Sequence, residues 1–197
     1  MKPLAHKQVE IARSMILENA RSLLEEAKLL YVHGFFARAY TLAHLSSEEI
    51  VKIPMIVRAV LDEASGIPYD WKKLAKRLNS HTKKIEATLF HDYLQTEIRA
   101  DDSDVNDYKA ALETIPDLNN EKNNSIYCNF NNGIAVSPLQ QISADSARVM
   151  IAVSNARIEW IKYQEKHTKG FLDGTFSEDF LERLRKIREI MDTLKNP

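Results

Sequence analysis

Two groups of charged residues in this chain could carry out acid–base chemistry. The first group places two adjacent carboxylates and a lysine in an otherwise apolar stretch, and the second places a histidine between two cations. The groups consist of Glu48, Glu49 and Lys52, and of Arg77, His81 and Lys84. A neutral histidine accepts protons, a cation stabilises developing negative charge, and a carboxylate orients both. Because charges are costly to bury alone, we expect the two groups to compensate each other.

A helix over residues 35 to 64 carries the carboxylates. Its inner face repeats at intervals of three and four, at Phe36, Ala39, Tyr40, Ala43, Ser47 and Ile50. Glu48 lies four residues before Lys52, which is the spacing of a helical ion pair. Both belong to the opposite arc, which contains His44, Glu48, Lys52, Arg38 and Glu49. Pro54 predicts a bend just beyond this arc. The arc is either a solvated face or a buried group of charges.

A second helix, over residues 69 to 99, carries the histidine. Its apolar stripe contains Trp71, Leu74, Leu78, Ile85 and Leu89. Arg77, His81 and Lys84 lie at intervals of four and three along one edge of the stripe. A short turn joins the two helices, which makes them antiparallel neighbours. We therefore predict that the first group is mostly buried and faces this edge; the alternative is that the edge is a basic margin facing water.

The remaining pattern is helical with one exception. Periodicity predicts helices over residues 8 to 31, 105 to 114 and 144 to 168, and a last one ending near residue 195. Residues 116 to 142 read instead as an Asn-rich loop and a hairpin, with strands at 126–130 and 134–136 joined at Asn132 and Gly133. The fold class is therefore all-α, an antiparallel helical bundle with a small β-hairpin insertion. We expect residues 1–197 to form one domain.

Composition limits the function classes. The formal net charge of −1 gives no global attraction to nucleic acid, so any RNA binding requires a local basic patch. We expect a cytoplasmic protein, because no signal peptide and no membrane-spanning run is visible in the sequence. Cys128 is the only cysteine, and the Glu-x-x-His motif of di-iron bundles does not occur. We expect neither a metal nor a cofactor.

The ordered set of motifs is similar to a known family. The set consists of the stretch from Gly34 to Ala43, Glu48-Glu49-Ile50-Val51-Lys52, Trp71, Ser80-His81-Thr82-Lys83-Lys84, and a late segment from Ile126-Tyr127 to Ser137-Pro138. This order resembles the AbiV family of bacterial abortive-infection proteins, from about residue 15 to residue 165. The resemblance implies a HEPN-like helical fold, frequent homodimerisation and a role in phage defence.

Many HEPN proteins are metal-independent ribonucleases with an Arg-x4-6-His motif, and the resemblance makes that activity a hypothesis here. Arg77 and His81 have only three residues between them, whereas Arg38 and His44 have five but would point about 120° apart on a helix. Both pairs are candidates. In the catalytic hypothesis the effector acts on RNA or translation. In the alternative it is a non-catalytic protein that sequesters a phage or translation-machinery component.

Overall fold

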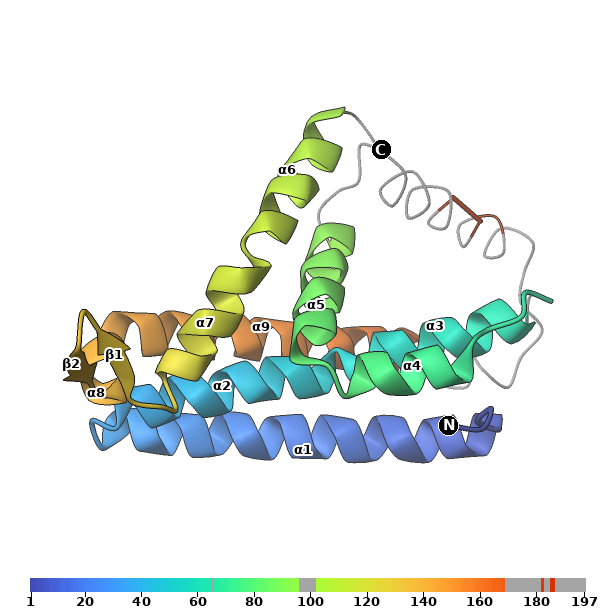
Figure 1. Cartoon of the computed structure of the whole chain (residues 1–197). Coiled ribbons are helices and arrows are strands. Elements are labelled where there is room, and N and C mark those ends of the chain that lie inside the picture. The colour runs from blue at the N-terminus through green and yellow to red at the C-terminus, as the bar shows by residue number, and fades with distance from the viewer. Residues whose placement is uncertain (65, 96–101, 169–181, 183–184, 187–197) are drawn as a thin grey trace.

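The computed structural model describes residues 1–64, 66–95 and 102–168, together with residues 182, 185 and 186. Four helices run lengthwise: α1 (His6–Val32), α2 (Phe36–Ile50), α3 (Lys52–Ala64) and α9 (Ala144–Thr168). Figure 1 shows that α2 and α3 follow each other end to end, with α1 and α9 alongside. α2 packs against both α1 and α9. Its small residues Ala37, Ala39, Ala43 and Ser46 are buried and allow these helices to approach closely.

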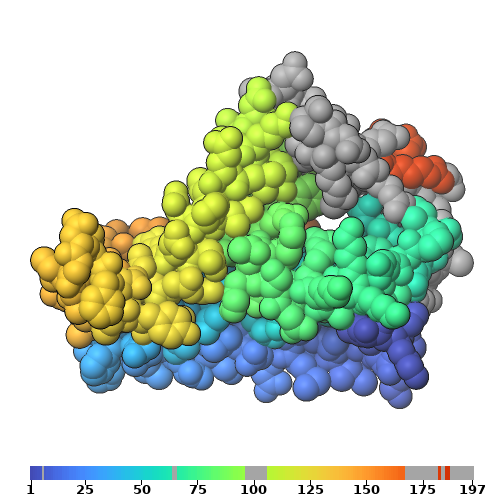
Figure 2. All heavy atoms as spheres, viewed as in Figure 1, coloured from blue at the N-terminus to red at the C-terminus, as the bar shows by residue number. Residues whose placement is uncertain are grey.

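The other helices cover one side of this layer. They are α4 (Trp71–Leu78), α5 (His81–Gln95), α6 (Asp102–Glu113) and α7 (Ile115–Asn124). α5 and the α6–α7 pair rise away from the lengthwise helices (Figure 1), and the side chains of α5 and α7 meet on the face shown in Figure 2. α5 and α7 both contact α2, so segments distant in sequence surround the helix that carries the carboxylates.

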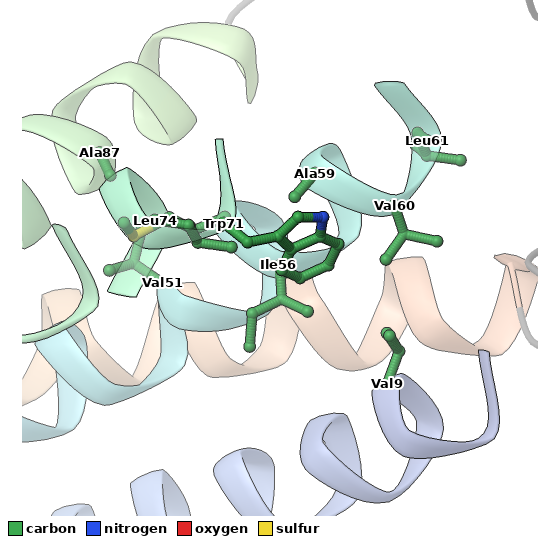
Figure 3. Packing of buried hydrophobic residues seen from close by; sticks show 10 residues of the cluster. Val9, Val51, Ile56, Ala59, Val60, Leu61, Trp71, Leu74 and Ala87 are labelled. Carbon is green, nitrogen blue, oxygen red and sulfur yellow. The ribbon is translucent and has the colours of Figure 1, made fainter. Parts of the chain in front are cut away.

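Figure 3 shows the apolar core beneath α4. Trp71 and Leu74 of α4 lie against Val9 of α1 and Ile56 and Val60 of α3, and all five side chains are buried. The Trp71 indole N–H donates to Glu63 Oε1 at 2.5 Å, which satisfies its one polar atom. Asp70 caps α4 by accepting from the Lys73 backbone N–H. This core fixes where α5 begins.

The predicted hairpin is present. β1 (Asn129–Asn131) and β2 (Ile134–Val136) are antiparallel, with Asn129 opposite Val136. Asn132 and Gly133 have φ values of 49° and 79°, which suit a two-residue turn of the type expected for Asn-Gly. A short helix, α8 (Pro138–Gln141), leads back towards α9. The all-α bundle with a small β-hairpin is confirmed.

Several predicted boundaries were wrong. The helix over 35 to 64 breaks at Val51, before Pro54. Pro54 lies in the first turn of α3, where its missing N–H costs little. The helix over 69 to 99 breaks at Asn79 and Ser80, both of which bond to nearby backbone: the Asn79 amide donates to the Ala75 carbonyl, and Ser80 Oγ accepts from the Lys83 N–H at 3.4 Å.

The Asn-rich stretch was predicted as a loop but forms α7, with Pro116 in its first turn. Residues 126–128 lie outside β1, so the first strand is shorter than predicted. The last predicted helix falls almost wholly outside the described residues. Within the described part of the chain, no helix combines the length and the apolar character that crossing a membrane requires.

Candidate functional site

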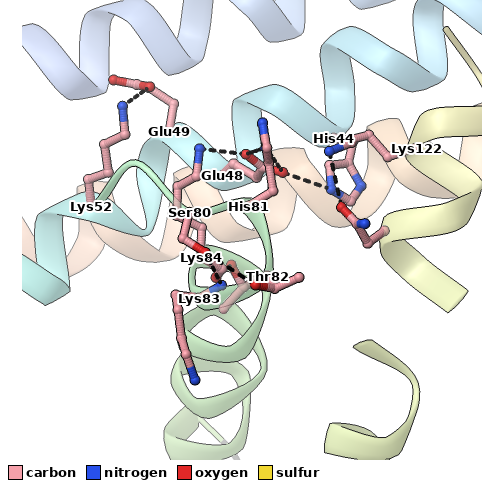
Figure 4. A network of polar contacts seen from close by, with 12 residues as sticks. His44, Glu48, Glu49, Lys52, Ser80, His81, Thr82, Lys83, Lys84 and Lys122 are labelled. Carbon is pink, nitrogen blue, oxygen red and sulfur yellow. Dashed lines mark hydrogen bonds and ion pairs between the residues drawn. The ribbon is translucent and has the colours of Figure 1, made fainter. Parts of the chain in front are cut away.

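Glu48 is the centre of a buried polar cluster formed by α2 and α5. Only 2% of Glu48 is exposed. Lys84 Nζ lies 2.6 Å from Glu48 Oε2, and His81 Nδ1 lies 2.6 Å from the same oxygen. From within α2, His44 Nε2 lies 3.3 Å from Oε1, a charge contact whose alignment falls short of a hydrogen bond. Figure 4 shows these side chains converging on one carboxylate.

The cluster keeps Glu48 ionised. Burial alone would raise the pKa of Glu48, but the contacts of His44 and Lys84 and their positive charges outweigh burial and lower the pKa from 4.5 to about 2. An ionised carboxylate only accepts hydrogen bonds. His81 therefore donates its Nδ1–H to Glu48, and the neutral form of the imidazole carries its lone pair on Nε2.

His81 is the part of the cluster that solvent reaches. Its side chain is 49% exposed, whereas those of Lys84 and Glu48 are 10% and 3% exposed. His81 is the first residue of α5, so the positive end of that helix lies beside it. A buried carboxylate thus orients a half-exposed imidazole.

The other predicted residues of the first group lie at the edge of the cluster. Lys52 pairs with Glu49 at 2.5 Å, three residues away, and not with Glu48 as the four-residue spacing predicted. The side chains of Lys52 and Glu49 are 25% and 18% exposed, so the prediction of burial holds fully for Glu48 alone. The solvated-face alternative is wrong for His44 and Glu48, which are both buried.

Lys122 was missed by the sequence analysis because its segment was read as a loop. It is buried on α7 and donates to Asn119 Oδ1 at 3.1 Å. Burial lowers the pKa of Lys122, the charge of Glu48 opposes this shift, and the charge of Lys84 adds to it. Lys122 therefore belongs to the electrostatic surroundings of Glu48 (Figure 4). Pro116, which favours a helix start, was the signal that could have found it.

A cleft of about 620 Å³ opens next to this cluster, between α2, α5, α7 and α9. His44, Ser47 and Glu48 of α2 line it, together with Tyr40, whose ring stacks on that of His44. Burial and the neighbouring Glu121 carboxylate raise the pKa of Tyr40, so its hydroxyl stays protonated. The α7 residues of the cleft could not be assigned from the sequence, because α7 was not predicted. The α9 residues could not be assigned either, because periodicity predicts the helix but not its position against α2.

Comparison with known families agrees with the motifs. A family model for AbiV, within the HEPN group, matches residues 8–159. This chain belongs to the AbiV family. AbiV membership implies a function in abortive infection, a form of phage defence. No curated protein and no solved structure matched the AbiV chain.

The two Arg–His pairs of this AbiV chain are arranged differently from a single helical motif. Arg38 is exposed whereas His44 is buried, so α2 does not bring them together. Arg77 is half-buried in the last turn of α4, and His81 begins α5. The charge of Arg77 acts on Tyr108 of α6, where it opposes the rise of the Tyr108 pKa to about 12 that burial and Glu86 cause.

The described residues of the AbiV chain contain no group of three or more histidine, cysteine, aspartate or glutamate side chains that could hold a metal ion. His44, His81 and Glu48 do meet, but Lys84 occupies one oxygen of the carboxylate. What the cluster offers is therefore a carboxylate–imidazole pair supported by a buried cation.

Proposed function

We propose that this AbiV protein is a metal-independent endoribonuclease in which His81 is the catalytic base. The observation that carries the proposal is the 2.6 Å contact between His81 Nδ1 and the buried, ionised Glu48. This contact fixes the tautomer and the direction of an exposed imidazole, as the carboxylate does in other acid–base sites.

In the proposed reaction His81 Nε2 takes the proton of a ribose 2′-hydroxyl. The 2′-oxygen then attacks the adjacent phosphorus, the bond to the 5′-oxygen breaks, and that oxygen takes a proton from solvent. The products are a 2′,3′-cyclic phosphate and a 5′-hydroxyl. Glu48, Lys84 and His44 are positioning residues in this scheme, because they hold His81 from beneath.

A local basic surface supports RNA binding. Three lysines of α4 are exposed, and Lys83 is exposed in the first turn of α5. Together with the half-buried Arg77, these lysines lie before and after His81 in the sequence. The three are Lys72, Lys73 and Lys76. Phosphates are attracted to such clusters and to the positive end of a helix. A nearly neutral protein can bind RNA through this surface alone.

The test uses purified protein, total RNA and defined tRNAs in the presence of a metal chelator, with and without phage lysate. The wild-type protein should produce 2′,3′-cyclic phosphate ends and should not cut the 2′-deoxy analogue of the same oligonucleotide. His81→Ala should lower cleavage about 10²- to 10⁴-fold, the usual contribution of a general base. His33→Ala, which removes another exposed histidine, is the matched control. Normal phage protection by His81→Ala would overturn the ribonuclease proposal.

The second candidate function, binding without catalysis, is favoured by an apolar surface at the hairpin. Tyr127, Phe130, Ile134 and Leu139 are 61–78% exposed. Exposed apolar groups of this kind commonly mark a protein-interaction site. A phage or translation-machinery protein that docks there would be sequestered with no chemistry at His81.

We further propose that the active unit is a homodimer with the charged cluster at or near the subunit interface. The support is the exposed apolar hairpin, which needs a surface to cover it, and Phe35, which is 53% exposed at the start of α2. A second subunit would then complete the arginine–histidine geometry that one chain lacks.

A further inference from the structure

The cleft beside Glu48 has the size and walls of a small-molecule site. Its volume of about 620 Å³ falls within the range of pockets that enclose a ligand. Aliphatic side chains from three helices form its walls: Ile85 and Leu89 of α5, Leu118 of α7, and Val149 and Val153 of α9. Apolar walls of this kind can bury the faces of a planar ring.

Two residues that line the cleft carry buried polar atoms without partners. His44 Nδ1 and Ser47 Oγ are buried, and neither has a hydrogen-bond partner among the described residues. His44 and Ser47 are only 5% and 3% exposed, and both line the cleft. A buried polar atom left without a partner is costly and uncommon, so these two atoms point to a ligand that completes them.

The charges at the cleft exclude an anion. Glu48, Glu121 and Asp145 line it, and among the described lining residues the one guanidinium or ammonium group, that of Arg157, is already held by Asp92 at 2.5 Å. A phosphate in the cleft would therefore meet three carboxylates, while Arg157 is engaged with Asp92 and His44 faces Glu48. A fully apolar ligand would leave His44 and Ser47 unsatisfied. An uncharged planar heterocycle with both donors and acceptors on its edge satisfies the walls, these two polar residues and the charge.

We propose that the cleft binds a nucleobase, with its ring between the aliphatic walls and its polar edge on His44 and Ser47, and with the phosphates outside. The choice of a nucleobase among planar heterocycles rests on the proposed ribonuclease function. Glu48 contacts both His44 and His81, so the cleft adjoins the candidate catalytic base. His44 and Ser47 are then specificity residues that select which base of an RNA is presented to His81.

The test is a binding titration of the full chain, followed by NMR, with adenosine, guanosine, cytidine and uridine. At least one nucleoside should bind with a Kd on the order of 0.1–1 mM, as expected for a ligand of this size. The 5′-monophosphate of that nucleoside should bind no more tightly than the nucleoside itself, because the described cleft residues offer no unengaged cation to the phosphate. Indole, which is planar but has only one donor, should bind more weakly than that nucleoside.

Three variants locate the binding site. Val153→Trp fills the cleft from α9 and should abolish nucleoside binding, whereas Ala156→Trp, on an exposed part of the same helix that does not line the cleft, should not. Ser47→Ala removes a hydroxyl that has no partner, so the fold should be unaffected while affinity falls about threefold to tenfold. Equal binding by all four proteins, or tighter binding of indole than of any nucleoside, would overturn the proposal.

A short RNA that contains one abasic ribose separates a base within a strand from a free nucleoside. If the strand supplies the base, the intact RNA binds more tightly than the abasic one, and Val153→Trp removes the difference. Nucleoside binding without RNA cleavage would leave the cleft assignment standing and refute the ribonuclease. Cleavage that depends on His81, without nucleoside binding or a base preference, would support the ribonuclease and refute the cleft assignment.

Discussion

Replacing Glu48 with glutamine tests the electrostatic account of the cluster. The folded-state pKa of Glu48 is about 2 against an ordinary 4.5, and one pKa unit corresponds to 1.36 kcal/mol, so the ionised group contributes about 3 kcal/mol at neutral pH. Because the folded-state pKa is depressed, this contribution is complete well above pH 4.5 and is lost as the pH falls towards 2. About 1 kcal/mol of it should be lost between pH 7 and pH 3.5.

The assay is urea unfolding followed by circular dichroism at several pH values. Glu48→Gln should lower the free energy of unfolding at pH 7 by about 3 to 5 kcal/mol, since it leaves the buried Lys84 ammonium without its anion. The difference from wild type should shrink as the pH falls to 3.5. Glu49→Gln, the adjacent and partly exposed glutamate, should cost less than about 1 kcal/mol. A Glu48→Gln difference that is small at pH 7, or that is the same at every pH, would refute the reasoning.

Three other predictions concern the core, a second histidine and the assembly. Leu74→Ala, at a position with no exposure, should destabilise the protein by about 2–5 kcal/mol in the same unfolding assay, and Leu29→Ala, at a position 63% exposed, by less than about 0.5 kcal/mol. Burial and the charge of Arg157 lower the pKa of His91 against the opposing effect of Asp92, and NMR should give a pKa of about 4. The free energy of unfolding should therefore decline as the pH falls below 6.5, because the unfolded chain binds the proton first. A measured pKa near 6.5 would contradict this. Light scattering should give twice the chain mass of 22.6 kDa, and the mass should fall towards that of one chain in Phe130→Glu if the hairpin forms the interface.

The long helices could be predicted from sequence because they bury continuous stripes. α1 and α9 agree with their predicted bounds to within about two residues, and the Asn-Gly turn identified the hairpin. The interruptions could not be predicted as easily. Asn79 and Ser80 end one helix and begin another through hydrogen bonds to nearby backbone. Local propensity does not decide whether such residues interrupt a helix or continue it. α7 has too few apolar residues for periodicity to show, and it is stabilised by packing against α5.

The site was predicted in part for a related reason. Complementary charge at helical spacing correctly brought His81 and Lys84 to Glu48, since a buried carboxylate requires cations. Spacing alone could not choose between Glu48 and Glu49 as the partner of Lys52, because three- and four-residue separations are both neighbours on a helix. Lys122 and the cleft walls depend on α7 and α9, whose positions against α2 are long-range contacts that periodicity does not encode.

The order of these elements along the chain has a consequence for synthesis on the ribosome. Glu48, His81 and Lys84 all lie within the first 95 residues, up to the end of α5, whereas the cleft needs Leu118 and Glu121 of α7 and Val153 of α9. Because a chain emerges with its N-terminus first, the carboxylate–imidazole pair can assemble while the walls of the cleft are still being translated. A nascent chain would then hold an oriented histidine before it could select a base, and selectivity would arrive only once α9 has been translated.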